Sequence, residues 1–382
     1  MNRINMKSAS AIKKTIRTNF NLQPPTTDKK YDMVVFCHLR WKFVYQRPQH
    51  IISRLSTTQK ILFIEEPIPF SPEEEFGYTL ENISHNLTVL QPKVSTLSDI
   101  GKLLKKLNLQ TFDYAWFYSP AFAELLPDLK VNTIIYDCMD ELSLFKGASE
   151  SLQKKEQYLI KEADLIFTGG KSLYESKSKI SANVHCFPSS VDLSHFKKVV
   201  RNLPIPKDLK TISHPMVGYI GVIDERINLE LIAATATMLP TFHFVMIGPL
   251  AKIGEQDLPR MQNIHYLGMK DYLELPNYLK AIDIAMMPFA LNDATKFISP
   301  TKTLEYMAAG KPIISTPVKD VVRDYEDHVQ IVETADQFCI ALETIVKLDN
   351  INYTDRYKEI LHATSWDNTV SQMFTLIKTI AQ

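Results

Sequence analysis

The stretch Ser299-Pro-Thr-Lys-Thr-Leu-Glu-Tyr-Met-Ala-Ala-Gly-Lys-Pro312 decides the fold. It predicts a complete short helix, because Ser299 is a good N-cap and Pro300 suits the first helical position. Gly310 is the residue type that most often follows the last helical turn, and Pro312 prevents continuation. Short apolar runs at 282–287 and 312–315 flank this helix, so the unit is predicted to be strand–helix–strand.

Two charged residues of this helix favour a nucleotide ligand. Lys302 and Glu305 are three residues apart, so both lie on one face near the helix N-terminus. Free N–H groups and the positive dipole end suit a phosphate there, and Lys302 adds a formal charge. Glu305 offers two acceptor oxygens to a diol such as a ribose. The alternative is an exposed ion pair that contributes only ~0.2–0.5 kcal/mol.

The alternation of strands and helices extends over both halves of the chain. Short apolar runs in the second half predict strands at 217–220, 242–247, 264–267, 282–287 and 312–315. In the first half, comparable runs predict strands at 33–37, 60–64, 114–118, 133–136 and 164–168. Helical patterns separate most of these runs, including one that starts near Pro48 and one at 152–162. This order is typical of doubly wound parallel sheets.

A Pro-containing stretch around 202–206 divides the chain into two α/β units. We expect a flexible basic tail at 1–30, a first domain at 31–198 and a second at 199–364. A final helix at 365–382 is expected to rejoin the first domain, with Ser365 as its N-cap and one apolar stripe. The tail carries seven basic residues against one acidic residue, which would permit weak contact with an anionic membrane surface.

Composition limits the class of protein. The 382 residues include 43 basic and 43 acidic side chains, so the net charge argues against nucleic acid as a partner. The sequence lacks an apolar run long enough to span a membrane, and its start lacks an apolar signal segment. The four cysteines form no metal-binding spacing and are expected to be reduced and buried. These features predict a cytoplasmic protein, and they leave the oligomeric state open.

Three familiar phosphate-site patterns are missing. Gly170-Lys171-Ser172 resembles the end of a P-loop, but Leu165 stands where the first glycine would be required. No G-x-G-x-x-G occurs, which argues against a typical dinucleotide-binding dehydrogenase. No D-x-D occurs either, so a metal-bridged diphosphate is not expected. Asp137 and Asp140 are three apart and could in principle hold a metal, but we expect them at a strand end facing the cleft.

A glycine pair marks a second candidate contact with the ligand. Gly218 and Gly221 bracket the turn after a predicted strand, and the chain has only 11 glycines. Either the backbone approaches a ligand closely here, or the turn is merely tight. Arg226 follows as a candidate diphosphate ligand, since its guanidinium can donate two parallel hydrogen bonds.

The loop after the first strand is basic and aromatic, and it should face the ligand crevice. We expect Trp41, Gln46 and Arg47 to contact an acceptor that bears phosphate and sugar. The alternative is a solvated basic face with Trp41 packed beneath it. His38 lies nearby and is weighed as a base, but Asp140 is the better candidate for contact with the acceptor.

Several motifs, in this order, resemble those of retaining GT-B glycosyltransferases of the glycogen-synthase-like superfamily. P-x-K-x-x-E-Y-M-A-A-G-K-P at 300–312 looks like their donor-binding helix. Segments 217–226, 245–249 and 263–268 look like the strands and loops of their nucleotide domain. Pro188-Ser-Ser-Val-Asp192 resembles the interdomain turn. Gln46-Arg-Pro-Gln49 and Tyr136-Asp-Cys-Met-Asp140 resemble a bacterial subgroup that makes cell-surface polysaccharide of the teichuronic-acid type.

The resemblance implies a GT-B fold, in which two Rossmann-like doubly wound domains face each other across a cleft. It implies a hexosyltransferase that moves a sugar from a nucleotide-sugar, with UDP favoured, to a saccharide or lipid-linked acceptor. Retention and independence of metal and cofactor are implied too. The catalytic candidates are Lys302, Arg226 and Asp140. The nucleotide-binding candidates are Gly218, Gly221, Gly248, Gly268, Thr301 and Glu305.

One position departs from the family pattern. Many relatives carry E-x7-E, and Phe297 stands here in place of the first glutamate. Asp293 is the nearest acidic residue upstream, and it cannot be assumed to substitute. Two alternatives therefore stay open beside the transferase: a nucleotide-sugar 2-epimerase on a similar scaffold, and a catalytically inactive binding or scaffold protein.

Overall fold

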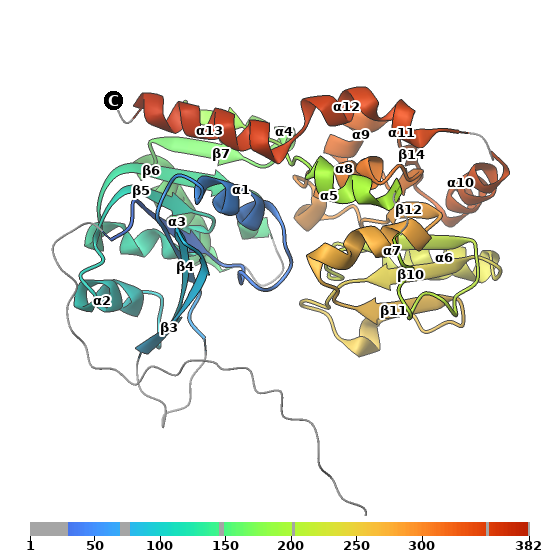
Figure 1. The fold of residues 1–382 in the computed structure, drawn as a ribbon, viewed down its shortest axis with the longest axis horizontal. Coiled ribbons are helices and arrows are strands. Elements are labelled where there is room, and N and C mark those ends of the chain that lie inside the picture. The colour runs from blue at the N-terminus through green and yellow to red at the C-terminus, as the bar shows by residue number, and fades with distance from the viewer. Residues whose placement is uncertain (1–29, 69–76, 145–148, 201–202, 349–350, 381–382) are drawn as a thin grey trace, which may run out of the picture.

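The computed structural model describes residues 30–68, 77–144, 149–200, 203–348 and 351–380. The chain forms two lobes, each built on its own β-sheet, and the last long helix lies over the first lobe (Figure 1). The expected basic tail lies outside the described residues, except for Lys30. Of the helices in the described ranges, none is both long enough and apolar enough to cross a membrane.

The first sheet has eight strands in the order β3-β4-β2-β1-β5-β6-β7-β8. Their bounds are β1 Met33–Cys37, β2 Ile61–Glu65, β3 Gly77–Ser84, β4 Leu87–Lys93, β5 Thr111–Phe117, β6 Lys130–Cys138, β7 Leu165–Thr168 and β8 Val184–Cys186. All neighbours are parallel except the edge pair β3–β4, which is antiparallel. Both faces of β1 are buried: Val34 and Phe36 join one core, and Met33 and Val35 join the other. This explains its unbroken apolar sequence.

Helices cover both faces of the first sheet. Their bounds are α1 Arg47–Leu55, α2 Asp99–Lys106, α3 Glu150–Glu162, α4 Lys171–Lys177 and α13 Trp366–Ile380, with 3-10 turns η1 Pro120–Asp128 and η2 Leu142–Leu144. Helix α13 packs on the first lobe. Trp366, Met373 and Ile377 are fully buried against the same core as Ile51 and Ile52 of α1. The Ser365 hydroxyl accepts from the N–H of Asn368 at 3.2 Å, which fits its predicted role as N-cap.

The second sheet has six parallel strands in the order β11-β10-β9-β12-β13-β14. Their bounds are β9 Met216–Ile220, β10 His243–Ile247, β11 Ile264–Gly268, β12 Ile284–Met287, β13 Ile313–Ser315 and β14 Gln330–Ile331. The helices are α5 Leu193–Phe196, α6 Leu229–Met238, α7 Leu275–Ala281, α8 Thr301–Ala308, α9 Lys319–Tyr325, α10 Ala335–Lys347, α11 Tyr353–Arg356 and α12 Lys358–Ala363. The 3-10 turns are η3 Lys197–Val200, η4 Glu255–Asp257, η5 Tyr272–Glu274 and η6 Asp293–Thr295.

The predicted α/β fold with two parallel sheets is confirmed, and each predicted strand is present to within a few residues. Strands β3, β4, β8 and β14 were not predicted. β3, β8 and β14 are edge strands and are short or half polar, so they lack the continuous apolar signal of a central strand. β4 has a buried start, Leu87–Leu90, but an exposed neighbour.

Two expectations about single residues were wrong. Ser299 does not cap α8, because Pro300 occupies the N-cap position and the helix begins at Thr301. The Ser299 carbonyl instead accepts a hydrogen bond from the Ser189 hydroxyl at 3.0 Å. Of the four free cysteines, Cys186 is only half-buried, because it lies on the short outer strand β8.

Candidate functional site

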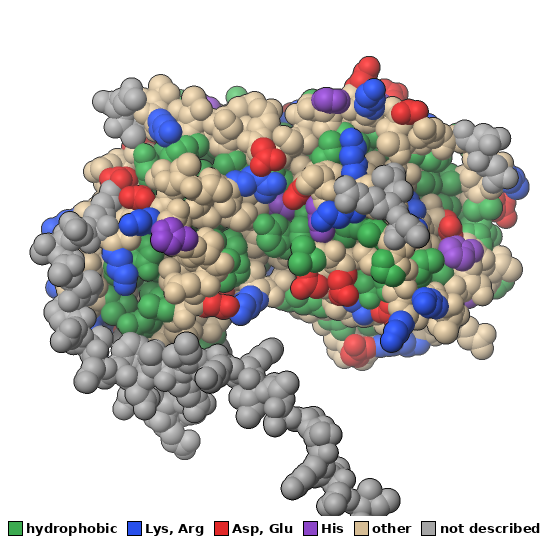
Figure 2. All heavy atoms as spheres, in the orientation of Figure 1, with side chains coloured by type: hydrophobic (Ala, Val, Ile, Leu, Met, Phe, Trp, Pro, Cys, Tyr) green, Lys and Arg blue, Asp and Glu red, His purple; other side chains and the backbone are tan. Residues whose placement is uncertain are grey.

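The candidate site lies between the lobes, where the loops after β1 and β6 face those after β9 and β10. A cavity of about 420 Å³ is lined by the 41–45 loop of the first lobe and by Gly221, Gly248, Tyr272 and Lys302 of the second. A smaller cavity of about 120 Å³ adjoins it and is lined by residues of both lobes, including Asp140, Arg226 and Glu305. Figure 2 shows acidic and basic side chains on both lobes beside the notch between them.

The start of α8 separates the two cavities. Lys302 lines both of them, and its Nζ donates to Glu305 Oε2 at 3.0 Å. The pair is largely shielded from water, with side-chain exposures of 16% for Lys302 and 4% for Glu305. The alternative of an exposed surface pair therefore does not describe this contact. Thr301 lines the smaller cavity, and its hydroxyl donates to Ser189 Oγ at 3.1 Å.

The C-terminal end of α8 is fixed by backbone hydrogen bonds, and a buried tyrosine near it bonds the helix to β9. Gly310 has φ +65°, and its N–H donates to Met307 O at 2.9 Å, while the N–H of Lys311 donates to Tyr306 O at 3.0 Å. This pair of bonds is the Schellman motif that the sequence signal at Gly310 predicted. Tyr306 is fully buried, and its hydroxyl accepts from the N–H of Ile220 on β9 at 2.8 Å.

Arg226 faces the smaller cavity but already has a partner. Its Nε and Nη2 donate to the Asp224 carboxylate at 2.8–3.1 Å, and Asp224 is buried. Asp140 follows β6 and lines the same cavity. Burial raises the pKa of the Asp140 carboxyl, and the positive charge of Arg226 opposes this rise. The two predicted residues thus line one cavity from opposite lobes.

The four predicted glycines have different roles. Gly221 lines both cavities, and a Cβ on it would come within 3.3 Å of Lys302 Cε. Gly248 has φ +153°, and a Cβ there would lie 1.8 Å from Gly221 O. Gly218 lies inside β9, where it makes room for Ile282, so its position fits sheet packing better than ligand contact. Gly268 ends β11 with φ +68°, and its carbonyl accepts from the N–H of Gly248.

The predicted acceptor loop is anchored from beneath. The N–H of Trp41 donates to Glu65 Oε1 at 2.8 Å, and its ring packs edge-on against Phe63 while lining the larger cavity. Arg47 is buried, with two nitrogens on the Asp137 carboxylate and Nη1 on Phe187 O at 2.7 Å. Arg47 and Gln46 both line the smaller cavity. Their contact with an acceptor stays a prediction.

The surroundings of His38 and Phe297 bear on the roles that were considered for them. Burial lowers the pKa of His38 from 6.5 to about 4, and its buried Nδ1 has no hydrogen-bond partner among the described residues. Phe297, at the position of the missing glutamate, packs against the core of the first lobe that contains Tyr136 and Leu173. An apolar contact between the lobes therefore replaces a carboxylate at this position.

An aromatic stack that the sequence did not reveal forms one wall of the larger cavity. Tyr272 stacks on Tyr45 of the first lobe with ring centroids 4.5 Å apart, and on His195 at 4.2 Å. His50 of α1 stacks on Trp366 of α13 at 4.9 Å. These residues are far apart in sequence and follow no common motif, so only the assembled fold brings them together.

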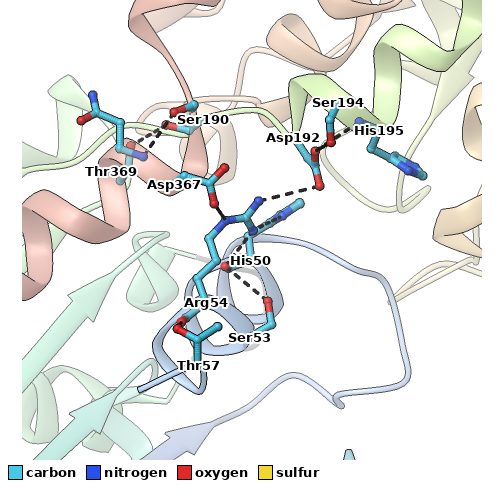
Figure 3. A network of polar contacts seen from close by, with 12 residues as sticks. His50, Ser53, Arg54, Thr57, Ser190, Asp192, Ser194, His195, Asp367 and Thr369 are labelled. Carbon is cyan, nitrogen blue, oxygen red and sulfur yellow. Dashed lines mark hydrogen bonds and ion pairs between the residues drawn. The ribbon is translucent and has the colours of Figure 1, made fainter. Parts of the chain in front are cut away.

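Arg54 of α1 contacts acidic residues on two other segments of the same region (Figure 3). Its Nε donates to Asp367 Oδ1 of α13 at 2.7 Å, and its Nη2 lies 3.7 Å from Asp192 Oδ2. Asp192 in turn caps α5 by accepting from the N–H of His195 at 3.2 Å. The guanidinium thus contacts both segments where the chain crosses between the lobes.

Part of the sequence matches a known protein family. Residues 214–347 match the family of group 1 glycosyl transferases. This match covers most of the second lobe. The two-lobed fold of the whole chain is of the GT-B type. The matched segment contains Gly221, Arg226, Lys302 and Glu305.

Solved structures with the same fold cover more than nine tenths of this chain. Sucrose-phosphate synthase from Thermosynechococcus elongatus is 13% identical, with a TM-score of 0.69 over 91% of this chain and 98% of that one. An E. coli protein described as trehalose-6-phosphate, bound with UDP-2-fluoro glucose, gives 0.66 at 13% identity over 92% and 99%. Anabaena Alr3699/HepE in complex with UDP-glucose gives 0.66 at 11% identity over 91% and 100%.

A curated relative is similar in sequence. It is named for teichuronic acid biosynthesis, the glycosyltransferase TuaH of Bacillus subtilis (strain 168). The two are 26% identical over 261 residues, which is 64% of this chain. The match spans 66% of that relative's own length, just under two thirds.

Proposed function

We propose that this glycosyltransferase moves a sugar from a nucleoside-diphosphate sugar, with UDP favoured, to a saccharide or lipid-linked acceptor. The observation that carries the proposal is the shielded Lys302–Glu305 pair at the start of α8, which lies between two cavities lined by both lobes. Two proteins of the same fold, one solved with UDP-2-fluoro glucose and the other with UDP and with UDP-glucose, support UDP as the nucleotide.

The diphosphate is proposed to replace Glu305 as the partner of Lys302. Cationic Lys302, Arg226 and the first N–H groups of α8 would stabilise the negative charge that grows on the leaving diphosphate. Glu305, released from Lys302, would accept hydrogen bonds from the ribose hydroxyls. Gly221 and Gly248 both line the larger cavity, so their backbone is proposed to contact the nucleotide. Their missing side chains make room for protein atoms, because a Cβ would lie 2.6 Å from the Tyr219 hydroxyl at Gly221 and 1.8 Å from Gly221 O at Gly248.

The first lobe is proposed to bind the acceptor. Asp140 would contact the acceptor hydroxyl from the smaller cavity, beside Arg226. The leaving phosphate would itself help to take the acceptor proton, and the sugar would keep its anomeric configuration. Trp41, Gln46 and Arg47 would contribute to the acceptor side, while the 41–45 loop helps to exclude water that could hydrolyse the donor.

We propose that the product belongs to cell-surface polysaccharide and that the protein works in the cytoplasm at the inner face of the membrane. The relative named for teichuronic acid biosynthesis supports the first part. The basic residues of the N-terminal segment support the second.

Nucleotide binding is the first test. A thermal-shift panel with UDP, GDP, ADP and TDP should show the largest stabilisation with UDP, since a ligand at 100 times its Kd stabilises by about 2.7 kcal/mol. UDP release should then be measured with UDP-glucose, UDP-galactose, UDP-N-acetylglucosamine and UDP-glucuronate. Binding of UDP without release from any donor would favour the inactive protein, to which Phe297 points. Epimerisation of the sugar without acceptor would favour the epimerase.

Independence from metal is tested by the same assay. In the described ranges, no group of three or more His, Cys, Asp or Glu side chains is placed to hold a metal ion. The sequence has no D-x-D, and Lys302, Arg226 and the start of α8 line the smaller cavity and can take the place of a metal, so the affinity for UDP is expected to change less than tenfold when EDTA is added. A larger loss would show that a divalent cation bridges the diphosphate.

A further inference from the structure

A buried contact between the lobes lies directly beside the start of α8. Asp320, at the start of α9 in the second lobe, is 2% exposed. Its carboxylate accepts from the N–H of Ser172 on α4 of the first lobe at 3.2 and 3.3 Å, and from the Ser172 hydroxyl at 2.5 Å. A carboxylate from one domain thus serves the first turn of a helix in the other.

Gly170 makes this close approach feasible. A Cβ on Gly170 would lie 2.6 Å from Asp320 Oδ2 and 2.7 Å from Ser299 Cβ. The φ of Gly170 is −167°, which any residue adopts, so the glycine is required for space and not for backbone freedom. The segment that resembled the end of a P-loop is therefore a docking point between the domains.

A second contact between the lobes involves the residues at the start of α8. The Ser189 hydroxyl donates to Ser299 O at 3.0 Å and accepts from the Thr301 hydroxyl at 3.1 Å. Ser189 belongs to the segment that leaves the first lobe. Gly170 and Ser189 together therefore enclose residues 299–301, which lead into the turn that carries Lys302.

The ion pairs around this contact are of a different kind. Lys171 pairs with Asp324, and Glu175 pairs with Lys319 and Arg323, mostly through exposed side chains. Exposed pairs of this sort contribute little to stability. Arg323 also lies 3.4 Å from Asp320 and is the cation that faces the buried carboxylate.

We infer that Asp320 is a positioning residue, which docks α4 of the first domain against α9, beside the residues that lead into α8, and so sets where Lys302 stands relative to Asp140. The inference rests on the proposed function, because it gives the diphosphate site and the acceptor side their mutual placement. Nucleotide is proposed to contact mainly residues of the second domain, so its affinity should depend less on this docking than turnover does. Turnover depends on it strongly, because the leaving group and the acceptor must face each other and water must be excluded.

Two variants test the docking. Gly170→Ala inserts a methyl group between the domains, and Asp320→Asn keeps the shape of the side chain but removes its charge. Each should lower the rate of UDP release from the fastest UDP-sugar at least tenfold, while the Kd for UDP changes less than about threefold. Small-angle X-ray scattering should show a larger radius of gyration for Gly170→Ala without ligand.

Matched controls separate positioning from general destabilisation. Gly101→Ala places a comparable methyl group 2.1 Å from Asp128 Oδ2, but within the first domain. Asp324→Asn removes a charge from the outer pair with Lys171. Both should leave the radius of gyration and the UDP-release rate within twofold of the parent.

The inference is overturned if both docking variants release UDP at the parental rate. It is also overturned if they lose UDP affinity as much as turnover, or if Gly101→Ala behaves like Gly170→Ala. Should Gly170→Ala fail to fold, Ser172→Ala takes its place, with Ser172→Thr as the conservative rescue. A parent protein that binds no nucleoside diphosphate would refute the proposed function instead, and the radius of gyration would still test the docking.

Discussion

Lys302 and Glu305 are partners in this structure, and substrate is proposed to separate them. Lys302→Ala should lower turnover about 100-fold, because its charge is needed most when the leaving diphosphate becomes anionic. Glu305→Gln should weaken UDP binding by ~1.5–3 kcal/mol, the value of a hydrogen bond to a charged group. Calorimetry with UDP and initial rates of UDP release measure the two effects. Parental values in both variants would remove the pair from the site.

Half-buried His38, whose Nδ1 atom is fully buried, is expected to make the stability of the protein depend on pH. Its pKa is lowered from 6.5 to about 4, so the unfolded chain binds a proton near pH 6.5 that the folded chain does not accept until about pH 4. The free energy of unfolding should therefore fall as pH falls through this window, by roughly 3 kcal/mol from this residue. Urea titrations of the parent and of His38→Gln at pH 7 and pH 4.5 measure the difference. If the free energy of unfolding changes equally with pH in the parent and in His38→Gln, His38 is not the cause.

Among the helices, α8 is held in place by its C-terminal end. Gly310→Ala should destabilise the protein by about 1–2 kcal/mol, since alanine is disfavoured at φ +65°. Gly254→Ala is the control, because Gly254 has a negative φ of −111° and its new Cβ would meet mainly the mobile end of Gln256. Denaturant midpoints compare the two. If Gly254→Ala costs as much as Gly310→Ala, the C-cap is not the cause.

Helix α13 should contribute to the stability of the first lobe, although it comes last in the chain. Met373 is fully buried there, so Met373→Ala should cost about 2–5 kcal/mol. The neighbouring exposed Gln372→Ala should change the free energy of unfolding by less than about 0.5 kcal/mol. Thermal melts of both variants provide the measurement, and a neutral Met373→Ala would argue that α13 is not part of this core.

Elements whose signal is local could be predicted from the sequence. The central strands are buried on both faces, so they appear as unbroken apolar runs, and α8 carries its own stop signal in Gly310. The aromatic stack of Tyr272 on Tyr45 could not be predicted, because it depends on how two lobes dock. The Asp320–Ser172 contact was missed for the same reason. The Arg226–Asp224 pair also changes the view of Arg226, since its charge is already partly neutralised.

At the scale of the whole molecule, the N-terminal segment is predicted to act outside the folded core. It is polar and basic, so deletion of residues 1–28 should leave the melting temperature unchanged but reduce binding to anionic liposomes. Neutral liposomes are the control. A large drop in melting temperature would show that the segment belongs to the fold, and unchanged liposome binding would show that it does not contact membranes.

The chain leaves the first lobe and returns to it at adjacent points. Val191 and Ser365 form a parallel bridge, and the N–H of Trp366 lies 3.4 Å from Val191 O. In topological terms, the second lobe is therefore an insertion into the first, and the two chain segments that lead into it and out of it lie side by side. A force applied between the ends of the chain would act mainly on the first lobe. The reason is that the Val191–Ser365 bridge can transmit this force without passing it through the second lobe. In an optical trap, the first rupture should release α13 and the first lobe while the second lobe remains folded.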